Sequence, residues 1–327
     1  MKSTVIARNM VKSIILVSIF LGPFVSAWGC SATLTSTGVK YSSIQAAFNS
    51  ASISDTITVD GLSGICFENV LFTNDRLRII LTGINNALIS GNQTKPTIDS
   101  RSKGNAIIGI TVNGGSEGIA IQRNANAIID RVTIQGAASN GIHINEMAFA
   151  VVMNSVIQNN GLSGILVSRG SSANIGFNNF TDSGAQSNII SGNGSNGVYV
   201  ASNSIAYIAS NTISNNRSHG VYISQVSSAR LSGNIINSNT VDGISVTGGS
   251  HVQLGDAFPA ITFTDLPNMT TALNGQYGIS CYSNATVEGH LGSGLQIWGA
   301  LSQFGGSTLL NQFSPNCGRT PSSLLTP

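Results

Sequence analysis

The chain has 327 residues, of which only 9% are charged, with 15 Lys and Arg against 13 Asp and Glu. So low a charge density excludes a nucleic-acid-binding protein with a basic stripe and an acidic disordered tail. The length suits one large domain, whose surface must consist mostly of Asn, Ser, Thr and Gly.

Residues 1–27 have the three regions of a cleaved secretory signal peptide. Basic residues precede an apolar run from Ile14 to Leu21, and small residues end at Ala27. Cleavage of this peptide would remove three of the fifteen basic residues. The mature chain would keep twelve basic and thirteen acidic residues, a net charge near −1. The apolar run is too short for a comfortable membrane span, and no later segment is long enough to be one.

We therefore expect a secreted, periplasmic or cell-surface protein without a transmembrane segment. Lipidation at Cys30 is an alternative anchor, although the bulky Trp28 stands where lipoprotein signals prefer small residues.

Positions 42–51 predict a short amphipathic helix, with Ser42 or Ser43 as its N-cap. Its apolar residues recur at helical spacing, at Ile44, Ala47, Phe48 and Ala51. A stacked solenoid exposes an apolar cross-section at its end, so we expect this helix to cap it. The first strand is predicted at Thr56–Val59, and Leu77–Leu81 and Ala87–Ser90 are predicted to belong to early, irregular turns.

From Gly118 to Ile279 one phrase recurs, which consists of glycine, a β-branched residue, any residue and another apolar residue. The glycines are Gly118, Gly141, Gly164, Gly197, Gly220, Gly243 and Gly278, at steps of 23, 23, 33, 23, 23 and 35 residues. A fixed period in the twenties with alternating apolar residues predicts a β-solenoid in which each repeat is one turn. We expect about ten turns, roughly 50 Å in length.

The repeat also predicts where each side chain points. Positions one and three after the glycine should face the core, and the position two after it should face outward. Asparagines recur four and nine residues before the glycine, and these should form ladders at the turns. The members of the two ladders are Asn160, Asn193, Asn216, Asn239 and Asn274, and Asn188, Asn211 and Asn234. A further column of alanines runs from Ala127 to Ala229.

Two turns carry insertions at the same column, at 176–187 and 255–268. Insertions at one column of a solenoid emerge on one side and often form its binding face. The two loops are three turns apart, roughly 14 Å, and could form the walls of a groove. Beyond Gly278 the phrase returns once, at Gly294–Ile297, and residues 298–327 are predicted to form a C-terminal cap.

The four cysteines predict two disulfides rather than a metal site, since no Cys-x-x-C pair occurs. Cys30 and Cys66 flank the N-terminal end of the repeats, and Cys281 and Cys317 flank the C-terminal end. Of three possible connectivities we favour these two local pairs, because a solenoid holds its ends far apart.

The most suggestive ligand-binding residues are Tyr199 and Tyr222, neighbours in the outward column. His219 and Asp242 lie beside them, in the column before the glycine. Aromatic rings on a polar wall can stack on sugars, although stacked tyrosines are also ordinary cross-strand contacts.

Catalytic candidates are weaker. Loop residues Asp182, Asp256 and Asp265 would have to converge, either as carboxylates for glycoside hydrolysis or as a Ca²⁺ site. Without that convergence we expect no cofactor and no metal. His143 shares a turn with Glu146, but a lone surface histidine is seldom catalytic. One column contains Arg123, Glu146 and Arg169. These residues form either a row of surface ion pairs or a binding site for an anionic sugar.

Together these residues resemble the right-handed parallel β-helix repeat proteins of the pectate-lyase-like superfamily, from about Tyr41 to Cys317. Within that group the chain is similar to secreted bacterial proteins with a Gly-x-Cys-x-Glu-Asn-Val segment, here Gly64 to Val70, and a late Gly-Ile-x-Cys, here Gly278 to Cys281. The resemblance implies an all-β, single-stranded parallel β-helix. Because the superfamily includes lyases, hydrolases, epimerases, adhesins and inert scaffolds, it does not decide the function.

The motifs of polygalacturonases and mannuronan epimerases are absent apart from an echo at Ser218-His219-Gly220. We therefore expect a non-catalytic protein, with the β-helix domain at 28–297, that presents a polar face to an extracellular polysaccharide. The alternative is a polysaccharide lyase or glycoside hydrolase with its site between the loops 176–187 and 255–268.

Overall fold

The computed structural model describes residues 29–73, 77–177, 185–254, 268–269 and 273–288, together with three short strand segments further on. The predicted signal peptide, most of both inserted loops and most of the predicted C-terminal cap lie outside these residues. Within the described part of the chain, no helix has the length and apolar character needed to cross a membrane.

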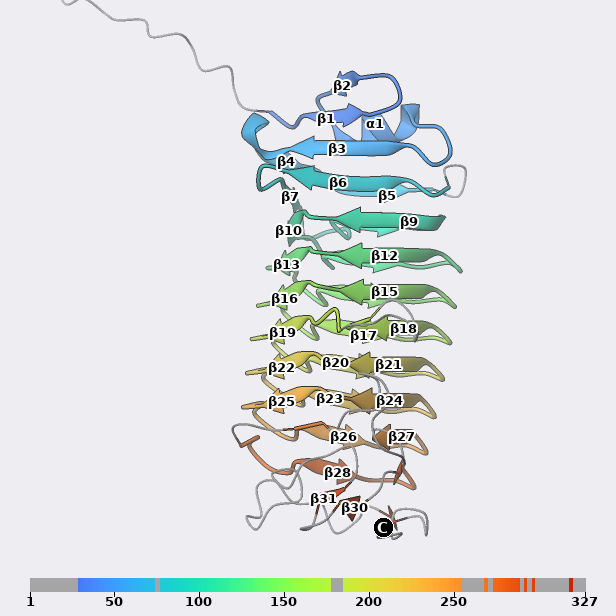
Figure 1. The fold of residues 1–327 in the computed structure, drawn as a ribbon, viewed down its shortest axis with the longest axis vertical. Helices are drawn as coiled ribbons and strands as arrows, with labels where there is room; N and C mark the ends of the chain where they lie inside the picture. Colours follow the sequence, from blue (N-terminus) through green and yellow to red (C-terminus); the bar gives the residue numbers. More distant parts are fainter. Residues whose placement is uncertain are drawn as a thin grey trace, which may run out of the picture.

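The described strands wind into a parallel β-solenoid whose turns stack along one long axis (Figure 1). Three sheets form its faces, and each full turn gives one strand to each sheet. Sheet A contains, in spatial order, β2 (Val39–Tyr41), β1 (Ala32–Leu34), β3 (Thr56–Asp60), β6 (Ile80–Ile84), β9 (Lys103–Ile108), β12 (Asn126–Asp130), β15 (Phe149–Met153), β18 (Ser172–Ile175), β21 (Ile205–Ala209), β24 (Ser228–Ser232), β27 (His251–Leu254), β29 (Thr286–Glu288) and β32 (Gly318–Arg319).

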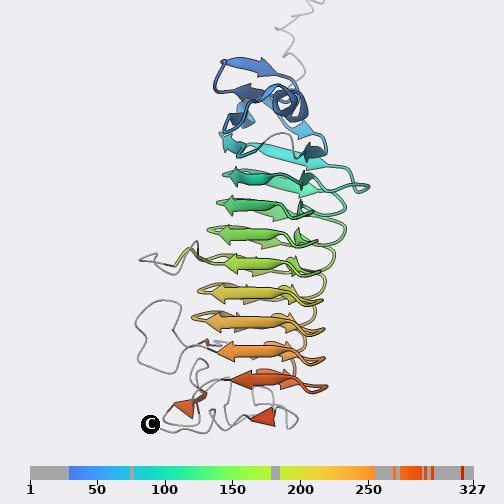
Figure 2. The same ribbon diagram turned by 90° about the vertical axis from the view of Figure 1, so that its right-hand side faces the viewer.

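Sheet B contains β4 (Cys66–Phe67), β7 (Leu88–Gly91), β10 (Thr111–Gly114), β13 (Thr133–Gln135), β16 (Val156–Gln158), β19 (Ile189–Ser191), β22 (Thr212–Ser214) and β25 (Ile235–Asn237). Sheet C contains β5 (Val70–Phe72), β8 (Ile98–Ser100), β11 (Ile119–Ile121), β14 (Ile142–Ile144), β17 (Ile165–Val167), β20 (Val198–Val200), β23 (Val221–Ile223), β26 (Ile244–Val246) and β28 (Ile279–Cys281). Figure 2 shows the same stack turned by 90°.

The register of sheet C confirms the predicted repeat. Ile119 pairs with Ile142, Ile142 with Ile165, and Ile165 with Val198, and the pairing continues to Ile279. These side chains are fully buried. At about 1.5–3 kcal/mol for each buried aliphatic side chain, such columns supply most of the stabilisation of the stack.

The recurring glycine is required by the close approach of successive turns. A Cβ at Gly220 would lie 2.7 Å from the carbonyl oxygen of Gly243 and 2.4 Å from Cγ2 of Ile236. Gly197 has the same surroundings, with the oxygen of Gly220 at 2.6 Å. No side chain therefore fits at these positions without displacing the neighbouring backbone.

Both predicted asparagine ladders are confirmed, and both are buried. Along the first, each Nδ2 donates to the Oδ1 of the asparagine one turn on, at 3.0 Å, from Asn160 to Asn274. Along the second, the corresponding distances are 2.7–3.1 Å, and the ladder extends to Asn268. The alanine column is also confirmed, since Ala127 to Ala229 pair in register in sheet A.

The N-terminal end is built from a short helix, two antiparallel strands and a disulfide. Helix α1 (Ile44–Ser50) begins after Ser43, whose side chain accepts a hydrogen bond from the Ala46 amide. Strands β1 and β2 extend sheet A beyond β3 with antiparallel pairing, which the sequence did not predict. The helix contacts β1, β3 and β5; its role as a lid stays a prediction.

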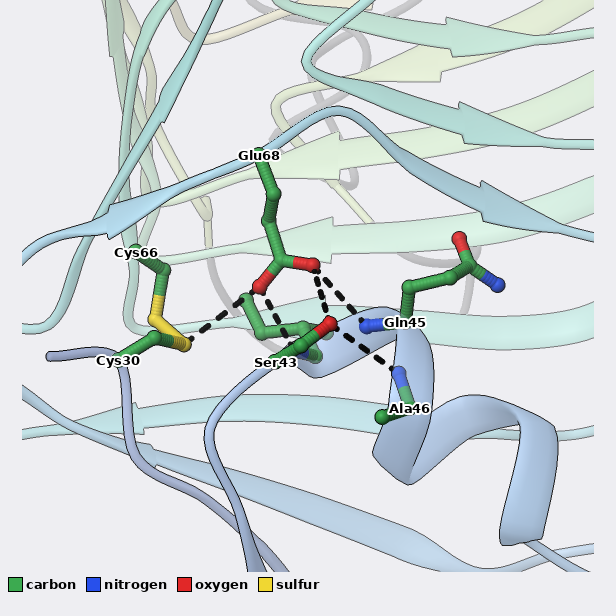
Figure 3. Close-up of a disulfide and its surroundings, with 7 residues drawn as sticks. Cys30, Ser43, Gln45, Ala46, Cys66 and Glu68 are labelled. Carbon is green, nitrogen blue, oxygen red and sulfur yellow. Dashed lines mark hydrogen bonds between the residues drawn. A yellow bond between two sulfur atoms is a disulfide. The ribbon is translucent and has the colours of Figure 1, made fainter.

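The predicted disulfide between Cys30 and Cys66 is confirmed. In Figure 3 it lies beside Glu68, which accepts hydrogen bonds from the amides of Ile44 and Gln45 at 2.7 and 3.2 Å and from the Ser43 hydroxyl at 2.8 Å. The Gly-x-Cys-x-Glu-Asn-Val segment therefore has a structural role, because it fastens the start of the helix to the first turn.

The C-terminal end differs from the prediction in two ways. Eight turns contain all three strands, and in the next the middle strand is reduced to a bridge at Met269, so the described stack is shorter than the ten turns expected. The strand at the end of the last phrase also pairs differently from the parallel repeat: β31 (Gln296–Ile297) pairs with β30 (Leu291–Gly292) in antiparallel fashion. Cys281 is fully buried, but Cys317 lies outside the described residues, so their pairing stays a prediction.

Candidate functional site

The outer face of sheet C gathers most of the residues that the sequence singled out. Its central column holds the middle residue of each strand, which from Gly118 onward is the residue two positions after the repeat glycine. In order along the axis these are Leu71, Asp99, Ala120, His143, Leu166, Tyr199, Tyr222, Ser245 and Ser280. Asp99, Ala120, Ser245 and Ser280 are nevertheless buried.

Three rings form one continuous stack on this face. The centroids of Tyr199 and Tyr222 are 4.9 Å apart, and those of Tyr222 and His219 are 5.1 Å apart, with interplanar angles of 24° and 27°. Tyr222 therefore stacks on two rings, Tyr199 of the preceding turn and His219 of its own turn. The rings thus pack against one another, and each gives part of its surface to its neighbour.

Asp242 contacts His219, the ring at one end of this stack. It is 1% exposed and lies 3.3 Å from Nδ1 of His219. Its carboxylate also accepts hydrogen bonds from the Ser280 hydroxyl at 2.6 Å and the Tyr277 amide at 2.9 Å. Burial alone would raise the pKa of Asp242, but the hydrogen bonds from His219, Ser280 and Tyr277 outweigh it and lower the pKa. Asp242 is therefore an ionised group that orients His219 and does not face solvent.

The tyrosine hydroxyls meet at Ser224. Tyr199 Oη lies 3.0 Å from Ser224 Oγ. Burial and the neighbouring Tyr199 raise the pKa of Tyr222, only partly offset by its hydrogen bond to Ser224. Both phenols are half-buried. A tyrosine hydroxyl is protonated at neutral pH in any case, so that of Tyr222 can donate a hydrogen bond to a ligand.

His143 has two hydrogen-bonding partners, neither of which is Glu146 of its own turn. Its Nδ1 lies 2.5 Å from Oε1 of Glu117, and its Nε2 lies 2.9 Å from Oγ of Ser168. Glu146 instead joins Arg123 and Arg169, at 4.0 and 3.7 Å. That trio is the predicted ladder of alternating charge, and its side chains are largely exposed.

A further polar cluster, which the sequence did not indicate, lies on the N-terminal side of His143. Asp99 is 6% exposed and accepts hydrogen bonds from Arg101 at 2.6 and 3.0 Å and from Gln122 at 2.7 Å. The hydrogen bond to Asp99 raises the pKa of Arg101. The only sequence signal was Asp99 in the outward column, in a turn whose strand precedes the regular glycine phrase.

The loop acids Asp182, Asp256 and Asp265 lie outside the described residues, as do the walls of the predicted groove. Among the residues that are described, one trio of possible metal ligands lies within 4.8 Å, namely Cys30, Cys66 and Glu68. Its two sulfurs are joined in the disulfide, so they are not available as thiolate ligands. A hollow of about 530 Å³ lies nearby, lined by residues that include Phe67, Asn92 and Lys95.

Comparison with known proteins agrees with this fold. Residues 117–257 match the family model described as a right handed beta helix region. No curated protein sequence matches the chain. The resemblance to right-handed parallel β-helix proteins is thereby confirmed.

Several solved structures are similar. One is the A-module of mannuronan C-5 epimerase AlgE4 from Azotobacter vinelandii, with 14% identity, a TM-score of 0.48 and coverage of 75% of this chain and 88% of that one. A double mutant of the periplasmic alginate epimerase AlgG gives 13% identity, a TM-score of 0.46 and coverage of 73% and 80%. An alginate lyase from Paenibacillus sp. str. FPU-7 has 17% identity and a TM-score of 0.36, and the match covers 84% of this chain and 94% of that one.

Proposed function

Since this chain folds as a right-handed parallel β-helix, we propose that it is an exported protein that binds a polysaccharide along the outer face of sheet C without cleaving the polysaccharide chain. The observation that carries the proposal is the stack of Tyr199, Tyr222 and His219 on an outward column. Export is supported by the disulfide between Cys30 and Cys66, since such bonds persist in oxidising compartments, and by the signal-peptide features of residues 1–27.

The stack suits a ligand rich in hydroxyl groups. Its rings are held by each other and by Asp242, so little side-chain entropy is lost when a ligand binds. Tyrosine offers an apolar body and a polar tip, which together fit the mixed surface of a sugar. The turns repeat along the axis about every 4.8 Å, so a linear polymer can lie across several of them.

Purified protein should be screened against neutral and acidic polysaccharides, with binding and product release recorded together. We expect binding without new reducing or unsaturated ends. Tyr222→Phe, which removes only the hydroxyl, should weaken binding about tenfold, equivalent to about 1.4 kcal/mol.

The matched control is Tyr207→Phe, since Tyr207 lies in β21 of sheet A, and it should bind as the parent does. Equal affinity of the Tyr222→Phe and parent proteins for every ligand would refute the proposed site. Release of unsaturated or reducing ends would instead favour the lyase or hydrolase alternative, with its site between loops 176–187 and 255–268.

A further inference from the structure

Glu117, His143 and Ser168 form a hydrogen-bonded chain across three successive turns of sheet C. Glu117 Oε1 lies 2.5 Å from Nδ1 of His143, and Nε2 of the same ring lies 2.9 Å from Ser168 Oγ. A hydroxyl bonded to a base that is oriented by a third group is the arrangement of an activated nucleophile. We propose that these residues form an ester-hydrolysing site, with Ser168 as the nucleophile, His143 as the general base and Glu117 as the positioning residue.

The two hydrogen bonds define a consistent tautomer. A carboxylate can only accept, so the proton of the neutral imidazole belongs on Nδ1, facing Glu117. Nε2 then has a free lone pair that accepts the Ser168 hydroxyl proton. The roles match those of a Ser-His-acid triad, which is identified by geometry and not by order along the chain.

The surroundings favour a small acyl group. Ser168 is 7% exposed, and the side chains of His143 and Glu117 are 18% and 19% exposed, so all three side chains are largely shielded from solvent. Asn145 Oδ1 lies 3.3 Å from Ser168 Oγ and is a second acceptor within reach of the serine proton, more distant than His143 Nε2 at 2.9 Å.

The reaction balances with water as the only co-substrate. Ser168 Oγ attacks the ester carbonyl while its proton moves to His143 Nε2, and Glu117 stabilises the imidazolium. The alcohol leaves with that proton, and an acyl-serine remains. Water then attacks the acyl carbon, His143 takes its proton, and the acid departs as Ser168 recovers a proton.

The site lies on the same face as the aromatic stack. His143 pairs in register with Leu166, and Leu166 pairs with Tyr199, so the relay is two turns from the first tyrosine, about 10 Å. An acyl ester carried by a sugar is therefore the natural substrate class. The choice of a sugar as carrier rests on the proposed binding function, whereas the ester-hydrolysing site itself does not, because small esters test it alone.

The purified protein should be treated with a fluorophosphonate probe, which labels activated serines, and assayed with p-nitrophenyl acetate. We expect a single label on the peptide that contains Ser168, and none in the Ser168→Ala variant. His143→Gln should lower the rate of hydrolysis by about 100-fold or more. Ser214→Ala, on sheet B, is the control and should keep both label and rate.

Glu117→Gln tests the positioning role. It should lower kcat while KM and the melting temperature stay close to those of the parent, an effect that a merely structural hydrogen bond would not produce. Absence of label from the parent protein, or equal hydrolysis by parent and Ser168→Ala, would overturn the proposal and leave the chain of hydrogen bonds as a staple between turns. Neither result would bear on polysaccharide binding, which Tyr222→Phe tests separately.

Discussion

Substitution of Asn216 by alanine should cost this protein a large part of its stability, because Asn216 lies in the middle of a buried ladder. Its side chain is fully buried. Its Oδ1 accepts hydrogen bonds from the backbone and side-chain amides of Asn193, at 3.1 and 3.0 Å. Its Nδ2 donates to the Ile190 carbonyl and to Asn239, at 3.2 and 3.0 Å.

Alanine would remove all four contacts and leave the Asn193 backbone amide and the Ile190 carbonyl without this partner inside the wall. A buried polar group that loses its partner costs about 1–3 kcal/mol, so we expect the free energy of unfolding to fall by about 2–5 kcal/mol. Urea denaturation followed by circular dichroism measures the change.

The control is Asn215→Gly, at the neighbouring exposed asparagine, where φ is +56° and glycine fits the backbone. It should change stability by less than about 1 kcal/mol. If Asn216→Ala were no more destabilising than this control, the ladders would not contribute to stability as argued.

Four other features of the structure lead to further predictions. Replacing both Cys30 and Cys66 by serine should lower the free energy of unfolding by about 4 kcal/mol, the loop-closure value for a separation of 36 residues, as measured by urea denaturation. Gly220→Ala should destabilise by more than about 1 kcal/mol, because its Cβ would meet the Gly243 oxygen at 2.7 Å; an unchanged melting temperature would contradict this. The pKa of Asp242 is lower in the folded protein than in the unfolded chain, so its ionised form stabilises the fold at any pH above its unfolded pKa. This contribution is lost as the pH falls below about 4 and through the folded pKa. Acid denaturation of Asp242→Asn should lack that component. Glu146→Gln should cost no more than about 1 kcal/mol, since its ion pairs are exposed, and thermal melts in low and high salt would reveal a larger effect.

The spacing of the sequence repeat was sufficient by itself to predict the fold, for a physical reason. Successive turns of a solenoid place equivalent residues over one another at a fixed spacing. The position of a residue within the repeat therefore predicts the direction in which its side chain points. Ile142 and Ile165 could therefore be assigned to the core, Asn193 and Asn216 to one ladder, and Tyr199 and Tyr222 to adjacent positions. Each of these placements is confirmed.

The same column logic failed where contacts run diagonally across columns or where the period breaks. Glu117, His143 and Ser168 stand at different positions relative to their glycines, so no column joins them, and only the reach and rotation of the side chains bring them within hydrogen-bonding distance. The role of Glu68 depends on a helix that lies 24 residues earlier, outside the regular repeats. The stacking of His219 on Tyr222 and the 3.3 Å distance from His219 Nδ1 to the Asp242 carboxylate of the next turn likewise depended on the tertiary structure. Stacking by repetition can be deduced from sequence, whereas the meeting of side chains from unlike positions depends on rotamers and packing, which only the folded chain decides.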